Sequence, residues 1–204
     1  NEISVYSLWQ AASVICIALF APMIAYGRSK KNIAVGIFLC TIFIGPLPIV
    51  LRLLEPYVGI SLIPANGSDA LWWILLFHGC LAVTLGSLGF VFIGSMAMEI
   101  VEDVEKTTGR REEGLLGTVN AFIHKLVGAG GVLIAGLIVS WAGFDDPNAT
   151  EEMLNGEIIN RFAFVHVVLG FCLPIFSTLL VLMFDIDRKV HLENVNDLGY
   201  VEKE

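Results

Sequence analysis

The stretch EIVEDVEKTTGRREEG, Glu99–Gly114, carries nine charged residues in its first fifteen positions, whereas the segments on both sides of it are almost wholly apolar. The complete chain has 204 residues, of which 56% are hydrophobic and 16% charged, and its mean hydropathy is +0.77. Soluble globular domains are roughly 45–50% apolar and about 25% charged. Charge gathered between long apolar runs therefore predicts an all-α integral membrane protein.

Five apolar stretches are long enough to cross a bilayer, because a membrane-spanning helix needs about 20 residues. We predict spans at residues 5–26, 32–54, 70–100, 115–144 and 162–184. They would form a membrane domain over residues 1–186, with a cytoplasmic tail over residues 187–204. Pro46 and Pro48 predict a kink in the second span, since proline lacks a backbone N–H.

The basic residues are distributed unevenly between the two ends of these spans. Nine of the 12 Lys and Arg residues lie in the first connection, the third connection and the tail, and only Arg52 and Arg161 lie toward the opposite side. By the positive-inside rule, the N-terminus is expected outside and the C-terminus in the cytoplasm of a multi-pass plasma (inner) membrane protein. Asn66 and Asn148 begin N-x-S/T triplets in the outer loops, and they are glycosylation candidates in a cell that glycosylates proteins.

The start of the chain also bears on its completeness. The first residue is Asn1, and the first apolar run lacks the basic start and cleavage site of a signal peptide. We therefore expect the chain to be a fragment of a longer protein.

Lys125 lies well inside the fourth span, about 15 Å along the helix from Leu115. A charge at this depth costs about 2.5–3.5 kcal/mol on insertion scales, so it should face a cavity or a carboxylate. We expect substrate or cation coupling, with a structural ion pair as the alternative. Two interpretations of His124 are possible: it forms a hydrogen bond to a neighbouring helix, or it binds substrate or transfers protons. Asn120, Ala121, His124 and Lys125 fall on overlapping faces that could line a cavity.

The charged stretch itself predicts a helix–turn–helix rich in ion pairs, although a solvated loop is the alternative. Gly109 can end the first helix in the left-handed conformation, and Gly114 is expected to belong to the turn. Glu102 and Lys106 stand in the favourable order for an i, i+4 pair. Glu113 falls in the first turn of the next helix, where the helix dipole favours an acid.

The segment MAMEIVEDVEKTTGRREEGLLGTVNAFIHKLVGAGG, residues 96–131, resembles the connection between the tenth and eleventh helices of the glycoside–pentoside–hexuronide:cation symporters. These are the melibiose-carrier-like branch of the major facilitator superfamily. Glu99 and Glu102 stand where that family usually has Asp. The following residues match the family pattern directly: Glu105, Gly109, Arg111, Glu113, Gly114 and Lys125.

This resemblance implies most of the carboxyl-terminal six-helix bundle of such a transporter, with the amino-terminal half as its partner. It places Lys125 near the sugar and cation sites, and Asn120, Ala121, His124 and Phe90 around the sugar. Melibiose carriers have different residues at the last four positions, which weakens the case for melibiose itself. The resemblance also implies that Glu99, Glu102, Glu105, Arg111 and Glu113 form ion pairs at a cytoplasmic gate.

We therefore expect a secondary active transporter that works by alternating access, a symporter of a sugar, glycoside or uronate coupled to Na⁺ or H⁺. A carrier of lysolipids or other amphiphiles is the alternative within the superfamily, and a non-transport membrane subunit is a more distant one. The chain has no H-E-x-x-H, G-x-S-x-G or paired-Asp motif, so we expect no enzyme. No cofactor, metal site or nucleic-acid partner is expected; the expected partners are the small-molecule substrate and the lipid bilayer.

Overall fold

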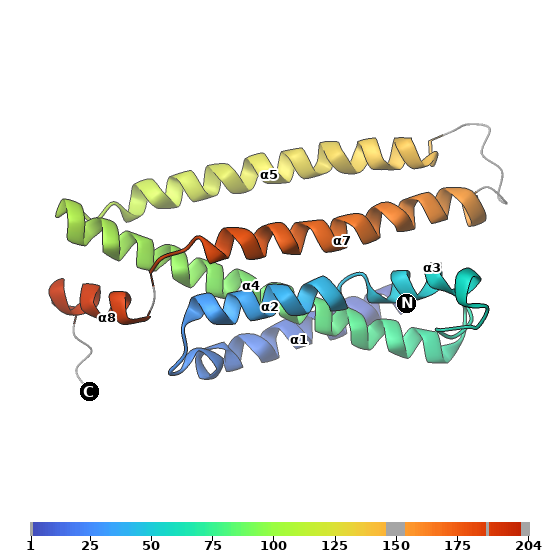
Figure 1. Cartoon of the computed structure of the whole chain (residues 1–204), viewed down its shortest axis with the longest axis horizontal. Helices are drawn as coiled ribbons and strands as arrows, with labels where there is room; N and C mark the ends of the chain where they lie inside the picture. The colour runs from blue at the N-terminus through green and yellow to red at the C-terminus, as the bar shows by residue number, and fades with distance from the viewer. Residues whose placement is uncertain (1, 146–153, 187, 201–204) are drawn as a thin grey trace.

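The computed structural model describes residues 2–145, 154–186 and 188–200, and this part of the chain is helical without any strand (Figure 1). The helices are α1 (Glu2–Ala25), α2 (Lys30–Ile44), α3 (Leu47–Val58), α4 (Asp69–Thr108), α5 (Glu113–Ala142), a short π-helix η1 (Leu154–Ile158), α7 (Ile159–Leu182) and α8 (Arg188–Asp197). The predicted all-α fold is confirmed.

Five helical segments of the described chain are long and apolar enough to cross a membrane. They are α1, α2 together with α3, α4, α5, and the segment Gly156–Leu182. The longest, α4, has 40 residues and continues past the predicted end of its span at residue 100 to Thr108. Much of the charged stretch is therefore the end of a membrane helix, and only Gly109–Glu112 separates it from α5.

The second span is interrupted between Ile44 and Leu47, where the two prolines predict a kink. Gly45 and Pro46 both keep right-handed helical dihedral angles, so the interruption comes from missing donors rather than from a turn. The carbonyl of Ile44 would normally accept from residue 48, but Pro48 has no N–H. Instead, His78 Nε2 on α4 lies 2.7 Å from that oxygen, and Nε2 must be the donor because a carbonyl only accepts.

The core of the bundle lies among α1, α2, α4 and α7. Its buried members are Ala21, Ala34, Ile37, Leu88, Phe92, Met96 and Val181. Small residues allow close approach between the helices, as is usual in membranes. Gly79 on α4 shows this most clearly, because a Cβ there would lie 1.8 Å from the Tyr6 hydroxyl of α1.

Helix α5 lies apart from this core (Figure 1). It runs beside α7, and its contacts with α4 and α7 are sparse. Every residue from Gly117 to Ala129 is exposed, whereas α4 has buried residues from Leu76 to Val101. Within the described chain, α5 therefore presents an open face that carries the predicted cavity residues.

Candidate functional site

The predicted cavity residues lie on the open side of α5, with one contact to α4. Asn120, Ala121, His124 and Lys125 are all exposed. The ring of His124 approaches that of Phe90 on α4, with centroids 6.0 Å apart and planes tilted by 59°. The structure thus brings together two residues that are 34 positions apart in sequence, and leaves Phe90 itself 67% exposed. Aromatic rings at this spacing attract each other weakly.

Lys125 lies twelve residues after the start of α5, which is about 18 Å along the helix axis. Neither a hydrogen bond nor an ion pair joins its ammonium to another residue among those that the structure describes. No carboxylate of the described residues is therefore its partner, which leaves both predicted alternatives open, a cavity or a carboxylate from elsewhere. A charge in this position requires water, a ligand or a carboxylate from outside the described residues.

The basic end of the bundle, which holds the α1–α2 connection, the α4–α5 connection and α8, contains most of the charged contacts. Glu99 lies inside it and is only 5% exposed. Its Oε1 is 2.7 Å from the Nζ of Lys30 at the start of α2. A buried carboxylate needs such a partner, because its desolvation is otherwise costly.

Helix α8 lies along the charged end of α4. The buried Asn194 donates to Asp103 over 3.0 Å, and Lys106 Nζ is 2.7 Å from Asp197 Oδ2. A further contact joins His191 Nδ1 and Glu102 Oε2, also 2.7 Å apart. His191 Nδ1 and Glu102 Oε2 are not aligned for a hydrogen bond. Their contact is therefore an ion pair only when His191 is protonated.

Arg111 is the centre of a second charged cluster, in the connection between α4 and α5. Its guanidinium lies 3.1 Å from Glu113 and 3.5 Å from Glu105, and it donates to the Tyr200 hydroxyl over 2.9 Å. Tyr200 in turn donates to Glu105 over 3.0 Å. The hydrogen bonds to Glu113 and Tyr200 raise the pKa of Arg111 above its usual range.

These contacts refine the predictions for the charged stretch. Gly109 ends α4 with φ +68°, as predicted, whereas Gly114 lies inside the first turn of α5 and has no positive φ. The predicted Glu102–Lys106 pair is not formed, because each residue has a nearer partner on α8. Sequence reasoning missed the partners Lys30, His191, Asn194, Asp197 and Tyr200, since their pairing depends on packing between distant segments.

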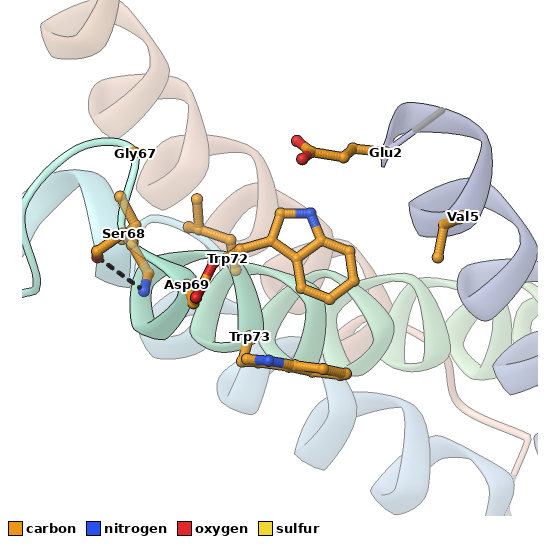
Figure 2. A pocket seen from close by; sticks show the side chains of 9 residues that line it. Glu2, Val5, Gly67, Ser68, Asp69, Trp72 and Trp73 are labelled. Carbon is orange, nitrogen blue, oxygen red and sulfur yellow. Dashed lines mark hydrogen bonds between the residues drawn. The ribbon is translucent and has the colours of Figure 1, made fainter.

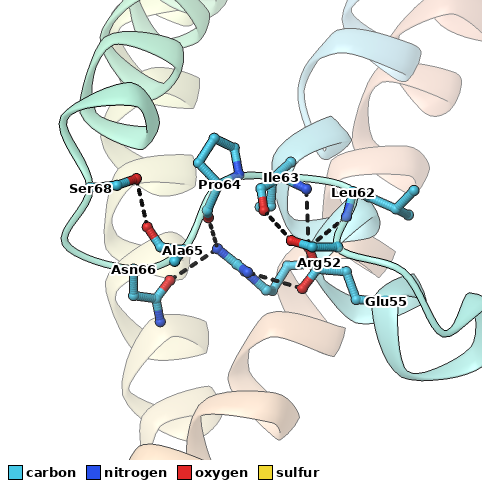
Figure 3. Close-up of polar contacts among 9 residues, drawn as sticks. Arg52, Glu55, Leu62, Ile63, Pro64, Ala65, Asn66 and Ser68 are labelled. Carbon is cyan, nitrogen blue, oxygen red and sulfur yellow. Dashed lines mark hydrogen bonds and ion pairs between the residues drawn. The ribbon is translucent and has the colours of Figure 1, made fainter.

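At the opposite end of the bundle, Arg52 and Glu55 of α3 organise the loop that leads to α4 (Figure 3). Arg52 donates to Glu55 over 2.9 Å, to the Pro64 carbonyl over 2.8 Å and to Asn66 Oδ1 over 3.0 Å. Glu55 accepts from the N–H groups of Leu62 and Ile63. Asn66 of the first N-x-S/T triplet is therefore fixed within an ordered loop, and Asn148 of the second lies outside the described residues.

A cavity of about 530 Å³ opens beside this loop, between the starts of α1 and α4 (Figure 2). Glu2 comes from α1, and Asp69, Trp72 and Trp73 come from α4. The two indole rings meet edge to face with centroids 4.8 Å apart. Ser68 caps α4 by accepting from Leu71 N, which fixes the position of these aromatic residues. The cavity combines stacking surfaces with carboxylates, but it shares no residue with the predicted site.

Metal-ligating side chains do not gather in the described part of the chain. No group of three or more His, Cys, Asp or Glu residues there could hold a metal ion.

Comparison with known proteins assigns the chain to a family. A family model described as "MFS/sugar transport protein" matches residues 1–188, which include all of the described helices that could span a membrane. No curated protein and no solved structure matched the chain. This family consists of transporters rather than enzymes. The chain therefore belongs to the MFS/sugar transport protein family and is a multi-pass membrane transporter protein.

Proposed function

We propose that this chain provides most of the carboxyl-terminal six-helix bundle of a symporter that couples the uptake of a sugar, glycoside or uronate to Na⁺ or H⁺. The observation that carries the proposal is the open face of α5, where Lys125 lies far from either helix end and has no partner in the described chain. Such a charge is costly in a membrane unless it meets a functional partner. The family match supports transport of a sugar in general.

In this proposal Lys125 contacts substrate or the cation-site carboxylates of the amino-terminal half. Asn120 and His124 offer hydrogen bonds to hydroxyl groups, and Phe90 offers an apolar surface against a sugar ring. Ala121 is the small residue on the same face and leaves room for the ligand. The family match fits alternating access, in which two bundles move about a site near the bilayer midplane.

The charged residues at the basic end have a separate role. Glu99, Glu102, Glu105, Arg111 and Glu113 are proposed to form part of a cytoplasmic gate, with the chain oriented so that its basic end faces the cytoplasm. Contacts within the chain hold most of this group, which favours a rigid gate base over a set of free charges. Contacts across to the other half would add to this base when the transporter faces outward.

The test is gradient-driven uptake by the complete transporter in proteoliposomes, with labelled sugars and an imposed Na⁺ or H⁺ gradient. Lys125→Ala should reduce accumulation to the level of empty liposomes. Arg110→Ala, which removes an exposed positive charge outside the proposed site, should accumulate substrate normally. An unchanged apparent Tm for Lys125→Ala shows that the loss is not a folding defect.

Two results would contradict the proposal. Normal accumulation by the Lys125→Ala variant would remove Lys125 from the site. Transport of a lysolipid but of no sugar would favour the amphiphile carrier. The coupling ion, Na⁺ or H⁺, is identified by which of the two gradients drives uptake.

A further inference from the structure

Two adjoining cavities open at the basic end of the bundle, away from the proposed transport site. The first has a volume of about 600 Å³ and lies between the start of α2 and the start of α8. The second has a volume of about 540 Å³ and runs along α2 toward the membrane interior. Ser29 and Asn32 line both cavities, so the two lie next to each other.

The first cavity is lined by basic side chains that are held in place. Lys31 donates to the Phe184 carbonyl over 2.6 Å, and Arg188 donates to the Gly27 carbonyl over 3.0 Å. Both acceptors are neutral, so these bonds fix the cations without cancelling their charge. Lys189 also lines this cavity.

The local charge remains positive after nearby acids are considered. Arg28 adds a further cation at the second cavity, whereas Lys30 is compensated by Glu99. Asp185 is exposed and precedes α8, and Asp187 is the other acid of that connection in the sequence. Lys189 has Glu193 one turn further along α8, so neither residue is counted in this balance. Against the two acids stand the three cations Arg28, Lys31 and Arg188, and the excess favours an anionic ligand.

The start of α2 adds a weaker attraction for an anion. Ser29 is its N-cap residue, and its side chain makes no capping hydrogen bond within the described chain. The first N–H groups of the 15-residue helix point out of its N-terminus, where the helix dipole also favours negative charge.

The second cavity explains why a lipid fits better than a free anion. Beyond Arg28, Ser29 and Asn32, its lining is apolar or small: Ile24, Ile33, Gly36, Ile37, Cys40 and Leu85. Gly36 and Cys40 lie about 9 and 15 Å along α2 from Lys30, which is the depth of the upper part of an acyl chain below its headgroup. Free phosphate would use only the first cavity.

We propose that these two cavities form a binding site for one anionic phospholipid, with its phosphate in the basic cavity and one acyl chain along α2. The lipid would join the α1–α2 connection to the start of α8, because Arg28 and Arg188 would contact the same headgroup. The site goes beyond transport itself, and its occupation can be measured without any substrate.

The experiment measures lipid retained by the complete purified transporter, by native mass spectrometry after titration with dioleoyl phosphatidylglycerol or dioleoyl phosphatidylcholine. Phosphatidylglycerol should bind at least tenfold more tightly. Arg28→Gln combined with Arg188→Gln should weaken it about thirtyfold, since each basic residue near an anionic surface contributes about a fivefold preference. Arg110→Gln, the matched change in the α4–α5 connection, should have no effect.

A second variant tests the acyl groove separately. A Cβ at Gly36 would meet nothing within 4 Å, so Gly36→Leu introduces a side chain into the groove without a clash at its Cβ. It should weaken phosphatidylglycerol at least fivefold, whereas Gly94→Leu on α4, which is equally open, should not. Equal binding of the two lipids would overturn the proposal. Binding of glycerol 3-phosphate as tight as that of the lipid, and unaffected by Gly36→Leu, would also overturn it in favour of a simple phosphate site.

Discussion

Replacement of His78 by Leu should destabilise the bundle through the broken second span. His78 Nε2 is 2.7 Å from the Ile44 carbonyl, the acceptor that loses its normal donor because residue 48 is proline. Removal of the imidazole leaves that oxygen without a partner in a region that excludes water. An unsatisfied buried acceptor costs about 1–3 kcal/mol. A central loss of about 2 kcal/mol corresponds to a fall of about 4–8 °C in apparent Tm for 150–250 residues.

The assay is thermal unfolding of the purified transporter in one detergent at one scan rate, because membrane proteins commonly unfold irreversibly. His166→Leu is the matched control, since His166 is exposed on α7 and has no hydrogen bond within the described chain. His78→Gln should lose less than His78→Leu, because the amide keeps a donor.

The decisive variant is Pro48→Ala in the His78→Leu background. Gly45 and Pro46 already have helical dihedral angles, so an N–H at position 48 can reach the Ile44 carbonyl and restore the missing helical bond. The double variant should recover at least half of the lost stability. If His78→Leu unfolds within about 1 °C of His166→Leu, or if Pro48→Ala recovers nothing, the assigned role of His78 is wrong.

Three further predictions concern the basic end. Lys30→Met leaves the buried Glu99 uncompensated and should lower the free energy of unfolding by about 2 kcal/mol. This is less than the loss for a fully buried pair, because Lys30 is partly exposed. A double-mutant cycle on apparent Tm tests the pairing, which is wrong if the effects of changing Lys30 and Glu99 simply add. Gly109→Ala should cost about 1–2 kcal/mol, since φ is +68°, and an unchanged Tm would contradict this. Arg111 has a raised pKa, so its stabilisation is complete below the ordinary guanidinium pKa and lost only above the folded value. The difference in stability between the wild type and Arg111→Gln should therefore be the same at pH 6 and pH 9, and a difference that changes with pH would refute the assignment.

The all-α membrane architecture could be predicted because its signals are local. Apolar runs of sufficient length specify spans wherever the neighbouring helices lie. Gly109 could be assigned as a helix end for the same reason, since a left-handed residue after a helix favours glycine. The interruption near Pro46 also follows from the missing donors of proline, which belong to the residue itself.

The partners of the charged residues could not be predicted from the same patterns. Asp103 and Asn194 are 91 positions apart, and Arg111 and Tyr200 are 89 apart. No periodicity relates such positions, and their contact depends on where α8 packs against α4. The i, i+4 rule favoured Glu102 with Lys106, but a partner on another helix prevailed because α8 lies along the same face. The His78 contact was missed for a similar reason, since its acceptor is a backbone carbonyl on another helix.

The charges of this chain separate into two classes by their surroundings, and each class carries a different consequence. Glu99 is buried beside Lys30, so loss of either residue leaves an uncompensated charge and lowers stability first. Lys125 is exposed on α5 and is unpaired among the described residues, so its removal uncovers no buried charge. Replacement of Lys125 should therefore reduce transport without lowering stability, whereas replacement of Glu99 should reduce both transport and stability. A charged residue in a membrane helix can thus contribute either to folding or to transport, and the presence of a partner within the bundle decides between the two roles.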